Sequence, residues 1–120
     1  MPIIFQARHV QETDFTSPYG MEEAAVLAED VSFMNTHGTA TVYNDEMESK
    51  AIHLAGLETV PVHSLKSYFG HTLGASGVIE SIICIHELKE NVLFGTLGYE
   101  KPGVSMPILV QADHQDECYS

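Results

Sequence analysis

A chain of 120 residues and 13.2 kDa has the size of one ordinary domain, and 44% hydrophobic with only 18% charged residues excludes a largely disordered polypeptide. Seventeen acidic against five basic residues give a formal charge of −12, which disfavours nucleic acid and anionic membrane surfaces as partners. Cys84 and Cys118 form neither a CxxC pair nor a disulfide framework, and no apolar run or leader pattern indicates insertion or export, so we expect a cytoplasmic protein.

In chain order, the first part of the sequence predicts a strand, a short helix and a second strand. Residues 3–10 have the apolar start and partial alternation of a strand. Turn residues at 17–20 separate this strand from a short helix at residues 21–28, whose first turn carries Glu22 and Glu23. Residues 31–35 are apolar enough to form a strand that is buried on both faces.

Residues 44–55 predict the second helix, with Asn44 as its N-cap and Gly56 as its stop. Glu46 and Lys50 have the spacing of an exposed i, i+4 ion pair. The apolar face of this helix is expected to contain Met47, Ala51, Leu54 and Ala55.

The remaining sequence predicts a strand at residues 60–65, a helix at 75–90, and an edge strand at 106–110 followed by an acidic tail. Pro61 lies near the beginning of its strand, where a missing backbone donor is tolerated. The helix at 75–90 is apolar nearly all round, so we expect it to be buried on most sides.

Alternating strands and helices with short connections predict an α/β fold, with a mostly parallel sheet and helices packed on its faces. In such sheets, functional residues gather beyond the carboxyl ends of the strands. His37 follows one predicted strand and His71 closely follows another. We therefore expect both imidazoles to project over the same edge of the sheet and to face one cavity.

Three motifs occur in a characteristic order: NTHGTAT at residues 35–41, ND at 44–45 followed by Glu48, and SLKSYFGHTLGASG at 64–77. Together they resemble the β-ketoacyl-acyl carrier protein synthases, which elongate fatty acids and polyketides within the thiolase-like superfamily. The resemblance is strongest over residues 31–88. The HGT motif, and Lys-Ser before Gly-His, distinguish these synthases from thiolases.

The resemblance implies one incomplete thiolase-like half, the carboxyl-terminal one, as a single partial domain over residues 1–120. It also implies a decarboxylative Claisen condensation, in which a malonyl thioester loses carbon dioxide and the carbanion attacks an acyl group held on a cysteine. By motif match, His37 and His71 are expected to be catalytic residues that present N–H groups to the enolate oxygen.

The same match implies supporting roles for other residues. Lys66 is expected to pair with Glu48 and thereby to fix the second histidine, while Glu80 is expected to hold loops and, in some members of the family, a cation. The hydroxyls of Thr39 and Thr41 are expected to bind the phosphopantetheine arm of the acyl carrier protein. No cofactor is expected to be bound by the chain itself.

Each of these residues has a structural alternative. The two histidines could cap strand ends, although their occurrence in matching motifs favours site residues. Lys66 and Glu48 could form an ordinary ion pair, and the two threonines could only stabilise their loop. Glu80 could simply cap or solvate a helix.

Neither cysteine suits the role of nucleophile. Cys84 lies between two isoleucines in the apolar helix and is expected to belong to the core, and Cys118 lies among acidic residues, which disfavour a thiolate. No metal site is predicted, because no pair with metal-ligand spacing occurs among the other histidines, which are His9, His53, His63, His86 and His114.

In the family, the nucleophilic cysteine belongs to the amino-terminal half, which this sequence does not resemble. We therefore expect a fragment that is inactive alone and acts with a missing synthase half or partner subunit, in a homo-oligomer. The alternative is a noncatalytic shortened homologue that serves as a dimerisation or scaffold partner of a synthase. The expected protein partner is the acyl carrier protein, although the charge of −12 contrasts with the basic docking surface of the family.

Overall fold

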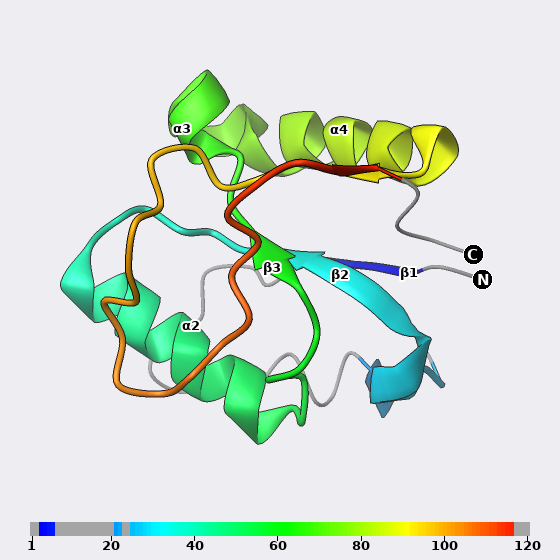
Figure 1. Ribbon diagram of the computed structural model, residues 1–120. Coiled ribbons are helices and arrows are strands. Elements are labelled where there is room, and N and C mark those ends of the chain that lie inside the picture. Colours follow the sequence, from blue (N-terminus) through cyan, green and yellow to red (C-terminus); the bar gives the residue numbers. More distant parts are fainter. Residues whose placement is uncertain (1–2, 7–20, 23–24, 117–120) are drawn as a thin grey trace.

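The computed structural model describes residues 3–6, 21–22 and 25–116 of the chain (Figure 1). The expected turn at 17–20 and residues 7–10 of the first expected strand lie outside this part. The elements, in chain order, are β1 (Ile3–Gln6), η1 (Ala28–Asp30), β2 (Val31–Asn35), α2 (Val42–Leu54), β3 (Val62–His63), α3 (Lys66–Phe69), η2 (Leu73–Ala75), α4 (Ser76–Glu90), β4 (Val92–Leu93) and β5 (Gln115–Asp116), where η denotes a 3-10 helix.

The central sheet is parallel, as predicted. Its strand order is β1-β2-β3, and both strand pairs run in the same direction, with Asn35 of β2 opposite His63 of β3. Val110 extends the sheet by a parallel bridge to Val62. The short strands β4 and β5 form a separate antiparallel pair, which the sequence did not predict.

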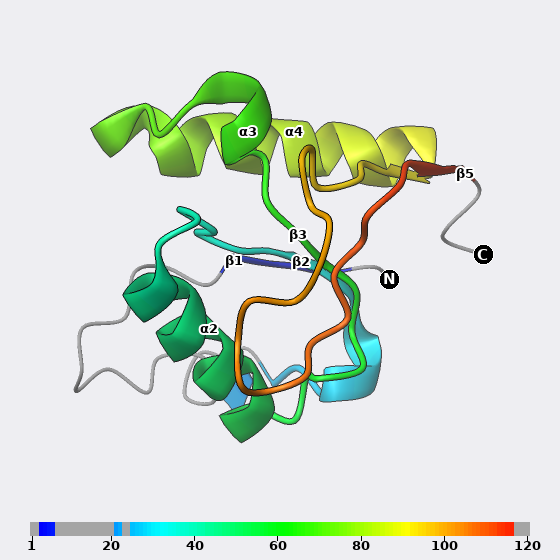
Figure 2. The same ribbon diagram turned by 60° about the vertical axis from the view of Figure 1, so that its left-hand side comes forward.

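Helices cover both faces of the sheet, so the fold has the layered α/β arrangement predicted above (Figure 2). α2 lies on one face, and α3 and α4 lie on the other. The core on the α2 side contains Met21, Val31, Met34, Ile52, Leu57, Val60 and Val62. The core on the α4 side contains Phe33, Leu65, Cys84 and Leu93.

α2 confirms the second predicted helix but differs from it at the start. It begins at Val42 with Thr41 as N-cap, so the prediction of Asn44 as the cap was wrong. It ends before Gly56, whose φ of +71° suits a glycine, and Glu46 and Lys50 form the expected pair at 3.5 Å. The predicted apolar face was wrong in part, because Leu54 is 58% exposed, whereas the buried residues are Glu48, Ser49 and Ile52.

α4 confirms the third predicted helix to within one residue, and Asn91 ends it in the left-handed conformation. Its buried residues are Ser76, Glu80, Cys84 and Glu87. The large apolar residues Val78, Ile82 and Ile85 are instead exposed. Polar groups of this helix therefore face the sheet, while an apolar strip faces outward.

Three short predicted elements differ from the structure. A continuous helix over 21–28 is wrong, since Ala25 has a φ of +53° and a 3-10 turn begins at Ala28. Only Val62–His63 is a strand within 60–65. No regular strand forms over 106–110, where Pro107 has no backbone N–H to donate and only Val110 bridges to the sheet.

The acidic end of the described chain is not simply a tail. Residues 115–116 form β5, which pairs with β4. Among the described residues, no helix combines the length and the apolar character that crossing a bilayer requires.

Candidate functional site

His37 lies in the loop between β2 and α2, and Glu48 of α2 holds this loop in place. The carboxylate accepts the backbone N–H of His37 at 2.6 Å and that of Gly38 at 2.8 Å. Burial raises the pKa of Glu48, and the two N–H groups oppose this shift. Glu48 therefore positions the backbone that carries the imidazole.

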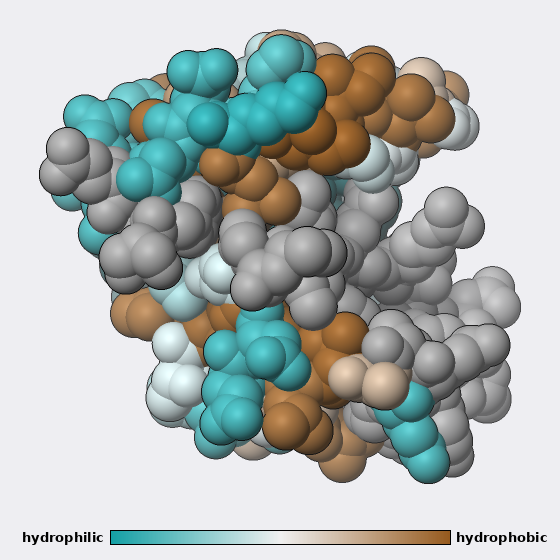
Figure 3. Space-filling model, turned by 90° about the vertical axis from the view of Figure 1, so that its right-hand side faces the viewer, coloured by the Kyte–Doolittle hydropathy of each residue, from teal (hydrophilic) through white to brown (hydrophobic). Residues whose placement is uncertain are grey.

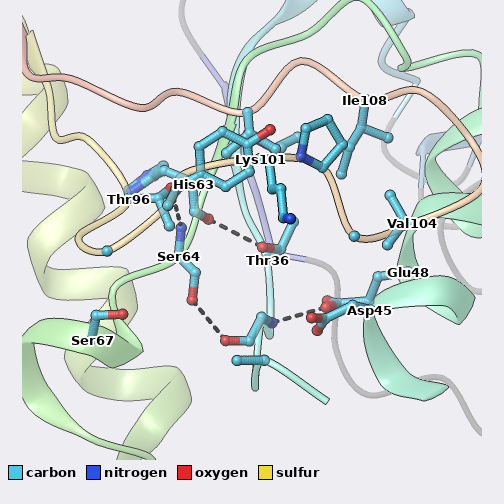
Figure 4. A pocket seen from close by; sticks show the side chains of 18 of the residues that line it. Thr36, Asp45, Glu48, His63, Ser64, Ser67, Thr96, Lys101, Val104 and Ile108 are labelled. Carbon is cyan, nitrogen blue, oxygen red and sulfur yellow. Dashed lines mark hydrogen bonds between the residues drawn. The ribbon is translucent and has the colours of Figure 1, made fainter. Parts of the chain in front are cut away.

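Gly38 is required by the same loop. Its φ is +46°, and an added Cβ would lie 2.6 Å from both Cβ and Oγ of Ser64. The Ser64 hydroxyl donates a hydrogen bond of 3.2 Å to the carbonyl oxygen of Gly38 (Figure 4). The loop after β2 thus packs closely on the segment after β3, and a side chain at position 38 would separate them.

His71 lies in a tight turn between α3 and η2. Gly70 ends α3 with a φ of +73°, and Thr72 and Leu73 both have positive φ, at +52° and +47°. The backbone N–H of Leu73 donates to Nδ1 of His71 at 3.2 Å. An Nδ1 that accepts this bond leaves the ring proton on Nε2, where it can be donated to a ligand.

The turn and the loop bring the two imidazoles together. Their ring centroids are 5.1 Å apart, and the rings meet edge to face at 87°. The expected convergence of His37 and His71 is therefore confirmed. Two rings at this distance can both reach one small oxygen-containing group.

Lys66 holds the turn that carries His71. Its Nζ lies 2.5 Å from Oε1 of Glu80 and donates to Oγ of Ser76 at 3.1 Å. The direct ion pair of Lys66 is with Glu80 and not with Glu48 as expected, because the Glu48 carboxylate holds the other loop and Glu80 lies on the helix that faces Lys66. The charge of Lys66 still acts on Glu48, where it opposes the rise in pKa that burial causes. Lys66 and Glu80 thus join the start of α3 to the first turns of α4 on either side of His71.

Thr39 and Thr41 lie together in the loop before α2. Their Oγ1 atoms are 2.9 Å apart, and the side-chain amide of Asn44 donates to Thr39 at 3.2 Å. These bonds support the loop. Binding of a phosphopantetheine arm by the two hydroxyls stays a prediction.

A cavity of about 500 Å³ lies between α2 and the segment that follows β4 (Figure 4). Its lining includes Gly38, Glu48, Ser64 and Thr96, but neither of the paired imidazoles. The cavity therefore contacts the loop of His37 through Gly38, but neither imidazole lines it. It is not the shared cavity that we expected the two rings to face.

Cys84 belongs to the core, as predicted. It is almost fully buried, and burial strongly raises the pKa of its thiol. Cys118 lies outside the described residues.

The sequence did not predict a second polar cluster, which lies between β3 and α4. Nε2 of His63 lies 3.4 Å from Oε2 of Glu87, and both side chains are completely buried. Burial lowers the pKa of His63 to about 4 and raises that of Glu87 to about 7. A single strand histidine and a helix glutamate carry no motif that could have indicated this contact.

The parallel α/β layer, with paired imidazoles on two adjacent loops, agrees with the expected partial thiolase-like half. Residues 15–100 match the family model described as beta-ketoacyl synthase, C-terminal domain. The chain belongs to the β-ketoacyl synthase family.

Relatives of known sequence and structure agree with this assignment. The chain is 38% identical over 85 residues to nodulation protein E of Rhizobium leguminosarum bv. trifolii, which covers 68% of the chain and 21% of the relative. It is 33% identical over 82 residues to the polyketide biosynthesis malonyl-ACP decarboxylase PksF of Bacillus subtilis, covering 68% of the chain and 20% of the relative.

The fold itself matches a solved member of the family. The crystal structure of a beta-ketoacyl synthase from Burkholderia phymatum superposes with a TM-score of 0.76 at 32% identity, covering 91% of this chain and 28% of that one. The chain thus spans about a fifth of the length of the curated relatives it matches.

Proposed function

We propose that this chain supplies the histidine side of a β-ketoacyl synthase site, in which His37 and His71 bind the thioester oxygen of a malonyl group carried by an acyl carrier protein. The observation that carries the proposal is the 5.1 Å separation of the two rings. The tautomer of His71 supports it, because an accepting Nδ1 leaves an N–H on Nε2.

The proposed chemistry begins with loss of carbon dioxide from the malonyl group. The bond between the α-carbon and the carboxylate breaks, carbon dioxide leaves, and the electron pair is delocalised onto the thioester oxygen as an enolate. N–H groups already fixed near that oxygen stabilise the developing charge without reorganising. The carbanion then attacks an acyl thioester, with the acyl-carrying thiol as leaving group, or takes up a proton.

Support for the decarboxylation step comes also from the relatives, since one of them is named as a malonyl-ACP decarboxylase. Glu48 and Lys66 act as positioning residues in this proposal, Glu48 through the loop of His37 and Lys66 through the turn of His71. Thr39 and Thr41 are proposed to align the phosphopantetheine arm.

The acyl-accepting thiol is proposed to come from an amino-terminal synthase half that packs on α4. Cys84 does not suit this task, because it is buried and its pKa is raised. α4 exposes an apolar strip made of Val78, Ile82 and Ile85, and Figure 3 shows apolar surface along the edge of the molecule where α4 lies. Exposed apolar surface of this kind marks an interaction site.

The test is malonyl decarboxylation by the chain assembled with the partner half that completes it. His37→Ala and His71→Ala are each expected to lower the rate by about 100-fold or more. His53→Ala, at a histidine of α2 on the other face of the sheet from the apolar strip of α4, serves as the control and should leave the rate unchanged. Unchanged decarboxylation in both site variants would refute the enolate role.

The apolar strip on α4 also fits a noncatalytic scaffold that dimerises with a synthase. The same assay separates the two functions. A scaffold would bind the partner half equally well with both histidines replaced, and the rate of the assembled enzyme would not depend on them.

A further inference from the structure

Three side chains with metal-binding atoms meet in the interior between β3 and α4, away from the paired imidazoles. His63 comes from β3, and Cys84 and Glu87 lie one turn apart on α4. Each residue offers one ligand atom: a ring nitrogen of His63, the sulfur of Cys84 and a carboxylate oxygen of Glu87. These three atoms all lie within 4.8 Å of one another. All three residues are at most 1% exposed.

The hydrogen bonds around this cluster are incomplete. Both ring nitrogens of His63 and Oε2 of Glu87 are buried without a hydrogen-bond partner. The side-chain amide of Asn35, which lies opposite His63 in the sheet register, is buried and unpartnered as well. Among the described residues, only one further buried side-chain atom, Oδ1 of Asp45, is in the same state. Buried polar groups normally have partners, so this concentration indicates a missing polar species.

We propose that His63, Cys84 and Glu87 bind one Zn²⁺ ion, which would join β3 to α4. Nitrogen, sulfur and carboxylate oxygen are the ligand types that zinc accepts, while a thiolate disfavours magnesium and calcium. A neutral imidazole, one thiolate and one carboxylate balance the ion's two positive charges. The interior would then hold no net charge, as burial requires.

The geometry agrees with a tetrahedral ion. Zinc-to-ligand bonds of about 2.0–2.3 Å place neighbouring ligand atoms roughly 3.3–3.7 Å apart. The contact between His63 and Glu87, at 3.4 Å, already has this length. The sulfur needs to approach by roughly 1.5 Å at most, since no pair in the cluster exceeds 4.8 Å. A water molecule would occupy the fourth position.

Binding would release the thiol proton of Cys84 to solvent as the zinc–sulfur bond forms.

This proposal departs from the sequence-based expectation of no metal. The ligands are 21 and 3 positions apart along the chain (84 − 63 and 87 − 84), and the fold rather than a motif brings them together. The site is separate from the proposed enolate-binding histidines, so either proposal can fail without the other.

The test is metal uptake by the tag-free 120-residue chain after removal of metals with a chelator. We expect one equivalent of Zn²⁺ to remain bound after dialysis, and Co²⁺ to produce a sulfur-to-cobalt charge-transfer absorption. Glu87→Gln and Cys84→Ser, which nearly preserve side-chain shape, are each expected to weaken Zn²⁺ binding by about 100-fold or more. Cys84→Ser should also abolish the charge-transfer band.

Cys118→Ser and His86→Ala are the matched controls, because they remove the other thiol and an exposed imidazole of the same helix. Both should retain full uptake. Circular dichroism of each variant establishes whether it is folded, and a chain that gains helix only when Zn²⁺ is added would also support the proposal. Failure of the folded wild type to retain zinc would overturn it, as would uptake that survives both ligand substitutions.

Discussion

The ammonium group of Lys66 lies 2.5 Å from Oε1 of Glu80, and these two almost buried side chains bracket the turn that carries His71. Ser76 receives a second hydrogen bond from the same ammonium group. The turn between them contains two successive non-glycine residues with positive φ, a conformation that persists only where the surroundings hold it. The ion pair therefore supports an unfavourable backbone at the place where the second imidazole is needed.

Replacing Lys66 with Met should test this relationship. The change leaves the buried Glu80 carboxylate without its lysine, and we expect a loss of about 3 kcal/mol in the free energy of unfolding. The double variant Lys66→Met with Glu80→Gln should recover part of that loss, because no carboxylate charge is then left at the position that the lysine faced. Urea unfolding measures both, and a double variant no more stable than the single one would contradict the ion-pair account.

Gly38→Ala should be more damaging than a comparable change elsewhere. The new Cβ would meet Ser64 at 2.6 Å in a residue whose φ is already +46°, so we expect a cost of about 2–4 kcal/mol. Gly56→Ala is the control, because Gly56 also has positive φ but has nothing within 4 Å of an added Cβ. It should cost about 1 kcal/mol, from backbone strain alone. Equal losses in denaturant unfolding would show that the contact with Ser64 is unimportant.

Glu48 should make stability fall as pH rises. Burial raises its pKa in the folded chain above the ordinary value of 4.5, so the folded state binds this proton more tightly than the unfolded state does. The free energy of unfolding should therefore decrease as pH rises from about 4.5 through the raised pKa. Glu48→Gln should remove the share of this slope that Glu48 contributes, which denaturant unfolding of the variant and the wild type at a series of pH values will measure.

Glu46→Gln provides a control of opposite sign on the same helix. Hydrogen bonds from Ser105 lower the pKa of Glu46. The contribution of Glu46 to the free energy of unfolding is therefore present above pH 4.5, the ordinary pKa, and is lost as pH falls through the lowered pKa. Difference curves of the same sign for the two variants would contradict the assigned shifts.

The longer elements could be predicted from the sequence because their signals are local. α2 and α4 each combine helical residues with a glycine or asparagine stop, and β2 is a compact apolar run. The shortest elements could not be predicted in this way. Whether Val110 joins the sheet depends on its contact with Val62, almost fifty positions away, and the local pattern around Pro107 does not encode that contact.

The candidate site shows the same division. The convergence of His37 and His71 follows from their motifs and from the parallel sheet, and the structure agrees. The partner of Lys66 could not be derived from spacing, since Glu48 and Glu80 lie at similar distances along the chain on either side of it. The choice depends on which helix faces the lysine. The contact of His63 with Glu87 likewise depends on the packing of β3 against α4.

The outward apolar strip of α4 leads to the last prediction, which concerns association. Ile82 is 50% exposed in the middle of this strip, so an acidic residue there can remain in solvent without disturbing the core. Ile82→Glu should therefore abolish binding of a partner half, or self-association of the chain, while leaving its unfolding midpoint nearly unchanged. Leu54→Glu makes the same chemical change at a residue of α2 that is 58% exposed, away from the strip, and should leave association intact. Sedimentation velocity over a range of concentrations measures both variants. If the strip is only solvent-exposed surface, the two variants should associate equally. If α4 forms an interface, Ile82→Glu alone should shift the chain to the monomer.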